Sequence, residues 1–227
     1  MTEQVVQASG GKAAVSDIDA TMEAVAFAGA ALAPFFLNDP RTGDAADSFA
    51  AMADLDVAAA AAEWPFADAD VAAAALTLMH AGLAAGADHD DLVWEYRRQF
   101  VGPGRFPVPP WGSVYTDREC VIFGESTLAL RAWMRAHGIQ RTTDERTPED
   151  HIGLMLAMLA FLAQQRPELV DEYLTAHLLT WASHYLDLLE ETTTHDFYRG
   201  LAQLTRATLV GMGEARGLAV TLPRFYR

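Results

Sequence analysis

Several side chains of this sequence belong to the types that a hydrolase needs for a nucleophile, a base and an orienting acid. They are Ser113, Ser126, Asp150 and His151. Asp150 and His151 are adjacent, and adjacent side chains on one helix point about 100° apart, so a relay between these two is unfavourable. A helical hydrolase is therefore the alternative that the sequence favours least, and we expect no catalytic residue.

Metal and phosphate chemistry are not indicated either. His177, Trp181 and His184 share a helical face, but two nitrogens from one helix make an incomplete metal site, and packing explains the face better. The spacing Glu-x-x-His, typical of helical metalloenzymes, does not occur. The single Cys120 excludes an internal disulfide, and the GPGR stretch at 102–105 lacks the lysine of a phosphate loop. We expect no metal and no cofactor.

Composition describes a packed, acidic protein. Of the 227 residues, 51% are hydrophobic, and the formal net charge is -15. Such a charge argues against nucleic-acid binding, because phosphates require Lys and Arg at the surface. A net charge of this sign suits a basic partner. The alternative, that the acidity only maintains solubility, explains the same net charge.

Neither export nor membrane insertion is indicated. The apolar run 24–37 is shorter than the ~20 residues that span a bilayer, contains Pro34, and follows acidic side chains where an export signal is basic. The pair Arg97-Arg98 lies mid-chain without an apolar stretch of export type behind it, so we interpret it as chance. We expect the protein in the cytoplasm.

The periodicity predicts an all-α protein. Residues 1–15 are polar and glycine-containing, and we expect a flexible tail there, with Ser16 as the first N-cap. Thr147 is expected to cap a later helix with Pro148 in its first position. The expected helices cover 16–37, 44–63, 68–86, 88–100, 124–137, 147–165, 167–191 and 195–215.

A Pro- and Gly-rich loop at 102–117 separates two groups of helices. The groups cover about 16–101 and 118–215, and together they are expected to form one helical-bundle domain over 16–227. The loop is long enough to act as a hinge, so a monomer, a homodimer and a domain-swapped form all remain open.

Three stretches contain residues that helix packing alone does not require. They are YRRQFVGPGRFPVPPWGSVYTD at 96–117, FGESTLALRAWMRAHG at 123–138 and TPEDHIGLMLAMLAFL at 147–162. HLLTW at 177–181 and FYRGLAQL at 197–204 follow. In this order and spacing, they resemble the TorD/DmsD family of redox-enzyme maturation chaperones over roughly 27–204. The Ala-rich part 44–86 matches only loosely.

The resemblance implies an all-helical, cytoplasmic chaperone that is not an enzyme. Its partner would be the twin-arginine signal peptide of a DMSO-reductase-type molybdoenzyme. The chaperone would hold that peptide until cofactor insertion and before export through the Tat pathway. A generic helical interaction module is the alternative; it explains the helices and the acidity but not the PPWGSVY and PEDHIG stretches.

Binding such a peptide requires carboxylates for guanidinium groups beside an apolar groove. Asp150 is expected to accept from an arginine, and His151 to donate to a peptide carbonyl or stack on it; alternatively, Asp150 caps the helix and His151 belongs to the core. The full set of expected peptide-binding residues is Trp111, Ser113, Tyr115, Glu125, Glu149, Asp150, His151 and Trp181.

Two more of these residues have open alternatives. Trp111 and Tyr115 lie in a proline-stiffened loop, which lowers the entropy lost on binding a peptide. Trp111 fits equally well as a plug between the two helical groups. Glu125, near a helix start, either binds an arginine of the peptide or pairs with Arg131, which we expect to be structural together with Trp133.

Overall fold

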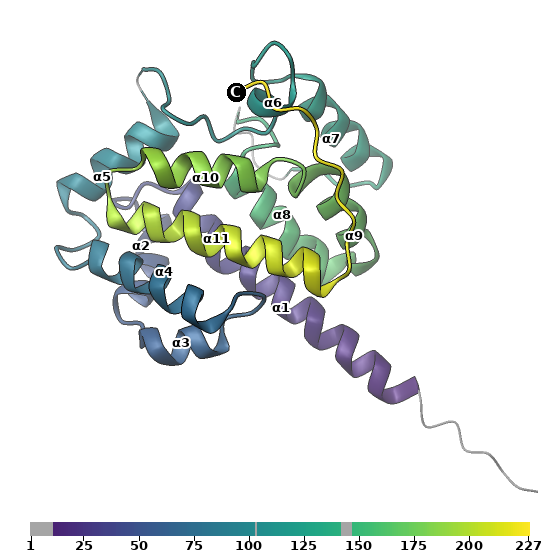
Figure 1. Cartoon of the computed structure of the whole chain (residues 1–227), viewed down its shortest axis with the longest axis horizontal. Coiled ribbons are helices and arrows are strands. Elements are labelled where there is room, and N and C mark those ends of the chain that lie inside the picture. Colours follow the sequence, from purple (N-terminus) through teal and green to yellow (C-terminus); the bar gives the residue numbers. More distant parts are fainter. Residues whose placement is uncertain (1–10, 103, 142–146) are drawn as a thin grey trace, which may run out of the picture.

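The structure is a computed structural model that describes residues 11–102, 104–141 and 147–227, with side chains from 20 onward except at 44. Within these ranges the chain forms α-helices and short helical turns, with one isolated β-bridge and no strand. The predicted all-α class is confirmed (Figure 1). The helices are α1 (Gly11–Leu37), α2 (Gly43–Ala53), α3 (Val57–Glu63), α4 (Ala69–Gly82), α5 (Asp90–Tyr96), α6 (Ser113–Thr116), α7 (Glu125–Ala136), α8 (Ile152–Gln165), α9 (Val170–Tyr173), α10 (Ala182–Thr192) and α11 (Asp196–Ala215).

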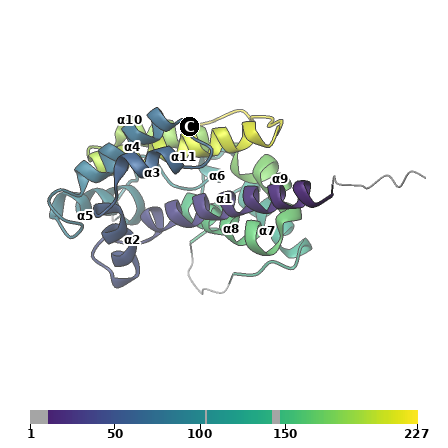
Figure 2. The same ribbon diagram turned by 90° about the horizontal axis from the view of Figure 1, so that it is seen from below.

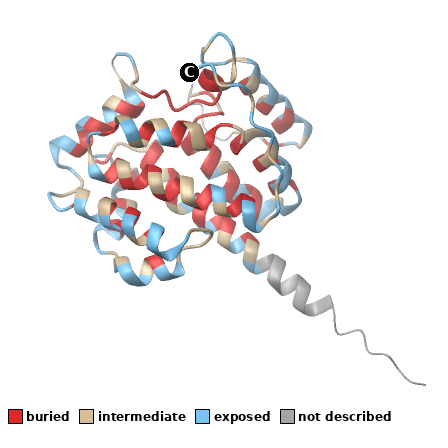
Figure 3. Cartoon of the chain, viewed as in Figure 1, coloured by how far each residue is buried: buried red, intermediate tan, exposed pale blue. Residues whose placement is uncertain are grey.

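The two predicted groups of helices pack into one another. The N-terminal helix α1 lies along α8, and α4 lies along α11, which also contacts α10. Figure 2 shows α4, α10 and α11 in one layer above α1 and α8. A Cβ added at Gly29 of α1 would lie 2.6 Å from the carbonyl oxygen of Leu156 in α8, so the two helix backbones approach closely there. The buried residues follow these contacts through the middle of the molecule (Figure 3).

Helix α1 differs from the expectation in both its start and its apolar length. It begins at Gly11, before Ser16, so part of the expected tail is helical; residues 1–10 lie outside the described ranges. Its residues Ala20–Leu37 form an apolar stretch that is long enough to cross a membrane by length and composition, and 50% of this stretch is buried inside the protein. The same properties characterise the core helix of a globular fold, and α1 packs against α8 in that way.

Two predicted helices are broken. The range 44–63 divides into α2 and α3, and Asp56 caps α3 by accepting a hydrogen bond of 3.1 Å from the backbone N–H of Ala59. The range 167–191 consists of a 3₁₀ turn, α9, a π-helical turn at Leu174–Leu178 and α10. The break between the last two places Trp181 at the start of α10 with φ -143°, outside helical geometry.

The predicted loop at 102–117 is more ordered than its composition suggests. It contains the short helix α6, and its residues from Val108 to Tyr115 are buried. On its N-terminal side a π-helical turn, Arg97–Val101, continues α5. Arg97 and Arg98 form ion pairs with Asp39 and Glu95, so both arginines of this pair serve the fold.

Candidate functional site

The candidate site lies where the Pro-rich loop meets the residues that precede α8. Trp111 and His151 form an isolated antiparallel β-bridge. On either side of it, the backbone N–H of Gly112 donates to the carbonyl of Asp150 at 3.1 Å, and that of Ile152 donates to the carbonyl of Pro110 at 2.9 Å. This pairing joins two of the stretches that the sequence singles out and fixes the side chains around them.

Asp150 is buried, with 3% of its surface exposed. Its Oδ2 accepts hydrogen bonds from the backbone N–H of Ser113 at 2.8 Å and from the hydroxyl of Thr127 at 2.9 Å. Its Oδ1 has no hydrogen-bond partner in the described protein. Burial raises the pKa of this carboxyl, and the hydrogen bonds from Ser113 and Thr127 oppose the rise. Asp150 therefore joins α6 to α7 with one oxygen and retains a second acceptor.

His151 is the N-cap of α8, which corrects the prediction that Thr147 caps this helix and that Asp150 and His151 lie in its first turn. Its Nδ1 accepts from the backbone N–H of Gly153 at 3.2 Å. Burial, together with the charge of Arg141, lowers the pKa of His151 to about 3. The imidazole is thus neutral at physiological pH, and helix capping occupies its Nδ1.

Trp111 and Tyr115 of the loop are buried and pack in two directions. The Trp111 ring contacts the rings of Phe106 and His151 edge to face, at centroid distances of 5.3 and 5.7 Å. Its Nε1 has no hydrogen-bond partner in the described protein. On the other side of the bridge, Tyr115 stacks on Trp181 at 6.2 Å with an interplanar angle of 6°.

Tyr115 is completely buried and fixed by its hydroxyl, which donates to the carbonyl of Pro109 at 2.6 Å. Burial raises the pKa of Tyr115, and the positive charge of Arg227 opposes the rise. Because the proton stays on the phenol, Tyr115 supplies an apolar ring face and no negative charge.

Two pockets flank the bridge. The first, about 250 Å³, is bounded by Asp150, Trp181 and Gly112 together with α7, the π-helical turn before Trp181, and the chain after α11. A Cβ at Gly112 would lie 2.7 Å from the Trp181 ring, so glycine permits this tryptophan to form the wall. The second pocket, about 340 Å³, is lined mainly by aromatic and apolar side chains: Phe36, Leu37, Tyr96, Phe100, Val101, Phe106 and Trp111, with Thr147 and His151.

The remaining predicted site residues divide between this centre and its surroundings. Ser113 is buried beside Asp150, whereas Glu125 is exposed at the start of α7. Arg131 pairs with Glu149 at 2.5 Å, so the suggested pairing of Arg131 with Glu125 is wrong. Glu149 is largely buried and serves this ion pair.

The histidine face of the π-helical turn and α10 contributes to packing. His177 contacts Trp133 at 5.4 Å and lines the first pocket, and burial lowers its pKa. His184 contacts Tyr115 at 5.7 Å. Among the described residues, no group of three or more His, Cys, Asp or Glu side chains could hold a metal ion.

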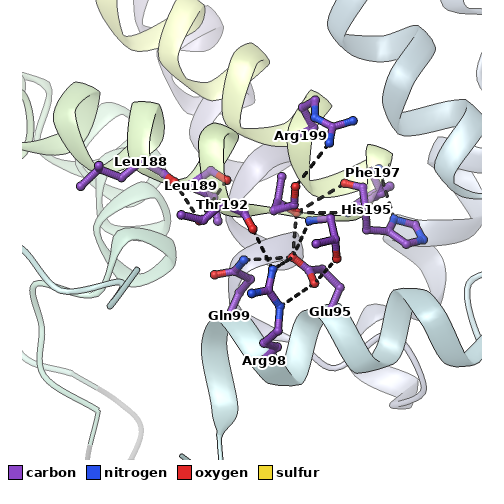
Figure 4. A network of polar contacts seen from close by, with 11 residues as sticks. Glu95, Arg98, Gln99, Leu188, Leu189, Thr192, His195, Phe197 and Arg199 are labelled. Carbon is purple, nitrogen blue, oxygen red and sulfur yellow. Dashed lines mark hydrogen bonds and ion pairs between the residues drawn. The ribbon is translucent and has the colours of Figure 1, made fainter. Parts of the chain in front are cut away.

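The sequence prediction missed a buried carboxylate that fixes the scaffold of the site. Glu95 of α5 accepts two hydrogen bonds from Arg98, both of 2.8 Å, and others from Gln99, Thr193 and Thr194 (Figure 4). Burial by itself raises the pKa of Glu95, but these donors outweigh it and lower the pKa to about 2. The network ties α5 to the link between α10 and α11. The i, i+3 spacing of Glu95 and Arg98 was its only signal in the sequence.

Comparison with protein families gives a match that covers the site. A family model described as nitrate reductase delta subunit matches residues 65–192. This range includes the Pro-rich loop, α7, α8 and α10, and therefore most of the walls of both pockets.

Curated proteins of similar sequence are chaperones by name. The chain is 49% identical over 133 residues to the probable Tat proofreading chaperone DmsD of Haemophilus influenzae, covering 59% of this chain and 66% of that protein. It is 43% identical over 150 residues to the Tat proofreading chaperone DmsD of Salmonella typhimurium, covering 65% and 70%. It is 26% identical over 123 residues to the chaperone protein TorD of Shewanella pealeana, covering 51% and 56%. The chain thus spans about two thirds of the length of the DmsD relatives.

Proposed function

The chain belongs to the TorD/DmsD family of redox-enzyme maturation chaperones, and from this membership we propose that it binds the twin-arginine leader of a redox enzyme in the cytoplasm. The client is a DMSO-reductase-type molybdoenzyme. The chaperone holds its leader until the cofactor has been inserted, and then releases the enzyme to the Tat pathway. No catalytic step is part of this role.

The observation that carries the proposal is the carboxyl group of Asp150 beside an aromatic wall. Its Oδ2 is used by the fold, while its Oδ1 accepts no hydrogen bond from the described protein, and Asp150 lines the first pocket. A guanidinium donates several hydrogen bonds in a fixed plane, and its charge stabilises an ionised carboxylate against the cost of burial. Asp150 is therefore the acceptor we assign to an arginine of the leader.

The second pocket suits the rest of a leader. A twin-arginine leader continues from its arginines into an apolar stretch, and the second pocket presents the rings of Phe36, Phe100, Phe106 and Trp111. Gly112 and Asp150 line the first pocket, and Trp111 and His151 of the β-bridge line the second, so we assign one extended or helical peptide to both. The net charge of -15 further favours a basic peptide during encounter.

The test compares Asp150→Asn with the native chain in titrations against the leader peptide of a molybdoenzyme encoded beside this gene. Asparagine keeps an oxygen for the Ser113 and Thr127 hydrogen bonds and removes the charge. Losing one hydrogen bond to a charged group costs about 1.5–3 kcal/mol, so the affinity should fall roughly 10- to 100-fold. Asp47→Asn, on an exposed face of α2 and outside the pocket lining, is the matched control and should bind like the native chain.

The peptide variants make the test specific. The native chain should prefer Arg-Arg over Lys-Lys, and both over a scrambled sequence, because a guanidinium donates in a fixed plane and a lysine ammonium does not. Asp150→Asn should reduce the difference between Arg-Arg and Lys-Lys. If the native chain binds all three peptides equally, the chaperone proposal fails. If it distinguishes them and Asp150→Asn distinguishes them equally well, another group accepts the arginine.

A further inference from the structure

The chain that follows α11 turns back over the site. Helix α11 ends at Ala215, and Gly217 adopts φ +63°, the left-handed conformation that favours glycine. The backbone N–H of Leu218 then donates to the carbonyl of Gly213 at 2.9 Å, which closes the helix end and reverses the chain direction. In Figure 1 the yellow chain leaves α11, passes α9 and ends beside α6. We call residues 218–227 the return segment.

The return segment forms part of one wall of the first pocket. Thr221 and Pro223 form part of the pocket lining, together with Asp150 and Trp181. Further along, the backbone N–H of Tyr226 donates to the carbonyl of Tyr115 at 2.9 Å. The segment is therefore in direct contact with the loop and the aromatic wall that we assign to the leader.

The far end of the segment is held by specific contacts. Phe225 stacks on the His184 ring at 4.2 Å with an interplanar angle of 10°, and the carbonyl of Arg227 is 2.6 Å from Nε2 of His184. The guanidinium of Arg227 donates to the carbonyls of Phe106 and Pro107, at 3.4 and 3.2 Å. These contacts connect the segment to α10 and to the part of the loop that borders the second pocket.

The chemistry of the segment resembles that of the proposed ligand. From residue 218 to 227 the sequence is LAVTLPRFYR, with two arginines and no acidic residue, in a chain whose net charge is -15. Arg224 and Arg227 flank two aromatic side chains, and the residues before Arg224 are mainly apolar. A basic, apolar and extended stretch is also what a twin-arginine leader would present to this surface.

The contacts of the return segment are weak enough for its docking to be reversible. Leu222 is 62% exposed and Tyr226 is 42% exposed, and the polar contacts of the segment lie at the surface. A segment with few buried contacts and exposed backbone hydrogen bonds opens with a small free energy. It can therefore leave without unfolding the helices beneath it.

We propose that the return segment is a built-in competitor, which covers the leader site in the free protein and must be displaced when the leader binds. This inference rests on the proposed function for the identity of the competing ligand, but not for the docking of the segment itself. The apparent affinity for the leader then equals the intrinsic affinity multiplied by the fraction of molecules with the segment undocked. A peptide that binds too weakly to displace the segment is rejected.

The experiment compares leader titrations of the full native chain with those of a Phe225→Ala/Arg227→Ala double variant, which loses the ring stack and the guanidinium contacts. Removing contacts of this kind shifts an equilibrium by about three- to tenfold, so the variant should bind the leader about three- to tenfold more tightly. Leu222→Ala, on the exposed side of the same segment, should match the native chain. Exchange of the Tyr226 amide hydrogen, measured in the native chain, should accelerate when the leader binds.

Further measurements separate the two proposals. A synthetic peptide of residues 218–227, added to the double variant, should bind the loop surface around the Tyr115 carbonyl. It should protect that surface from hydrogen exchange. If this peptide binds while no form of the chain binds a leader, docking of the segment holds and the chaperone function fails. If leaders bind with the same affinity to the native chain and the double variant, and Tyr226 exchange does not change, the competitor is refuted. Weaker leader binding by the double variant also refutes it, because the segment would then be part of the binding surface.

Discussion

Replacing Glu95 by glutamine should destabilise the protein in a pH-dependent manner. Oε1 of Glu95 accepts from Arg98, Gln99, Thr193 and the backbone N–H of Thr194, and Oε2 accepts from Arg98 and the Thr194 hydroxyl. A glutamine places an NH₂ group, which cannot accept these bonds, where one of the oxygens lies. The variant therefore leaves donors unpaired in a site that is closed to water.

The size of the effect follows from the pKa of this carboxyl. Its pKa falls from 4.5 to about 2 on folding, and each unit corresponds to about 1.4 kcal/mol. Ionised Glu95 thus contributes about 3 kcal/mol to the free energy of unfolding, a difference of about 6–12 °C in melting temperature for a chain of this size. Because the folded pKa is depressed, this contribution is fully present above pH 4.5 and is lost as the pH falls towards 2.

Urea unfolding followed by circular dichroism at a series of pH values tests this account. At pH 7 the variant should be less stable than the native chain by about 3 kcal/mol, and the difference should shrink steadily below pH 4.5. Glu63→Gln, which removes a carboxylate from an exposed position on α3, is a control for a general effect of charge. If the stability difference between the native chain and Glu95→Gln stays constant from pH 7 to pH 3, Glu95 is not an ionised carboxylate with several hydrogen bonds in the folded protein.

Two further predictions concern the walls of the site. Gly112→Ala forces the Trp181 ring to move, since the added Cβ would lie 2.7 Å from it. The variant should lose about 1–3 kcal/mol of stability, and its tryptophan emission should change. Gly43→Ala, which has open space around it, should show neither effect. His151, with a pKa of about 3, should keep the NMR shifts of a neutral ring from pH 7.5 down to pH 5, and a titration midpoint near 6.5 would contradict its burial as the cap of α8.

The helices could be predicted because their apolar spacing is local information. The start of α8 could not, although Thr147 and Pro148 are favourable start residues. The backbone N–H of His151 donates to the carbonyl of Pro148 at 3.1 Å and closes a turn there, and residues 110–112 pair with 150–152. The helix therefore begins only after His151, whose ring provides the cap. Tertiary contacts thus override a strong local signal.

The break before α10 has a similar origin. The apolar pattern of 167–191 is continuous, but Trp181 packs against Gly112 and stacks on Tyr115, and its backbone leaves helical geometry there. Nothing within a helical turn of Trp181 encodes this requirement.

The centre of the site was predicted from the stretches that helix packing does not explain, and Asp150, His151, Trp111, Ser113, Tyr115 and Trp181 do lie together. Their role in peptide binding stays a prediction. The role of Glu95 was not predicted, because charged residues are normally exposed and its partners Thr193 and Thr194 are almost 100 residues away in the sequence.

The packing of α1 along α8 determines when the protein can fold during its synthesis. Helix α1 is complete at Leu37, but the helix that covers its apolar face ends only at Gln165. At roughly 5–20 residues per second, the ribosome needs on the order of ten seconds to make the chain in between. For that time the apolar stretch Ala20–Leu37 lacks the helix against which most of it packs, so this stretch stays exposed on the nascent chain.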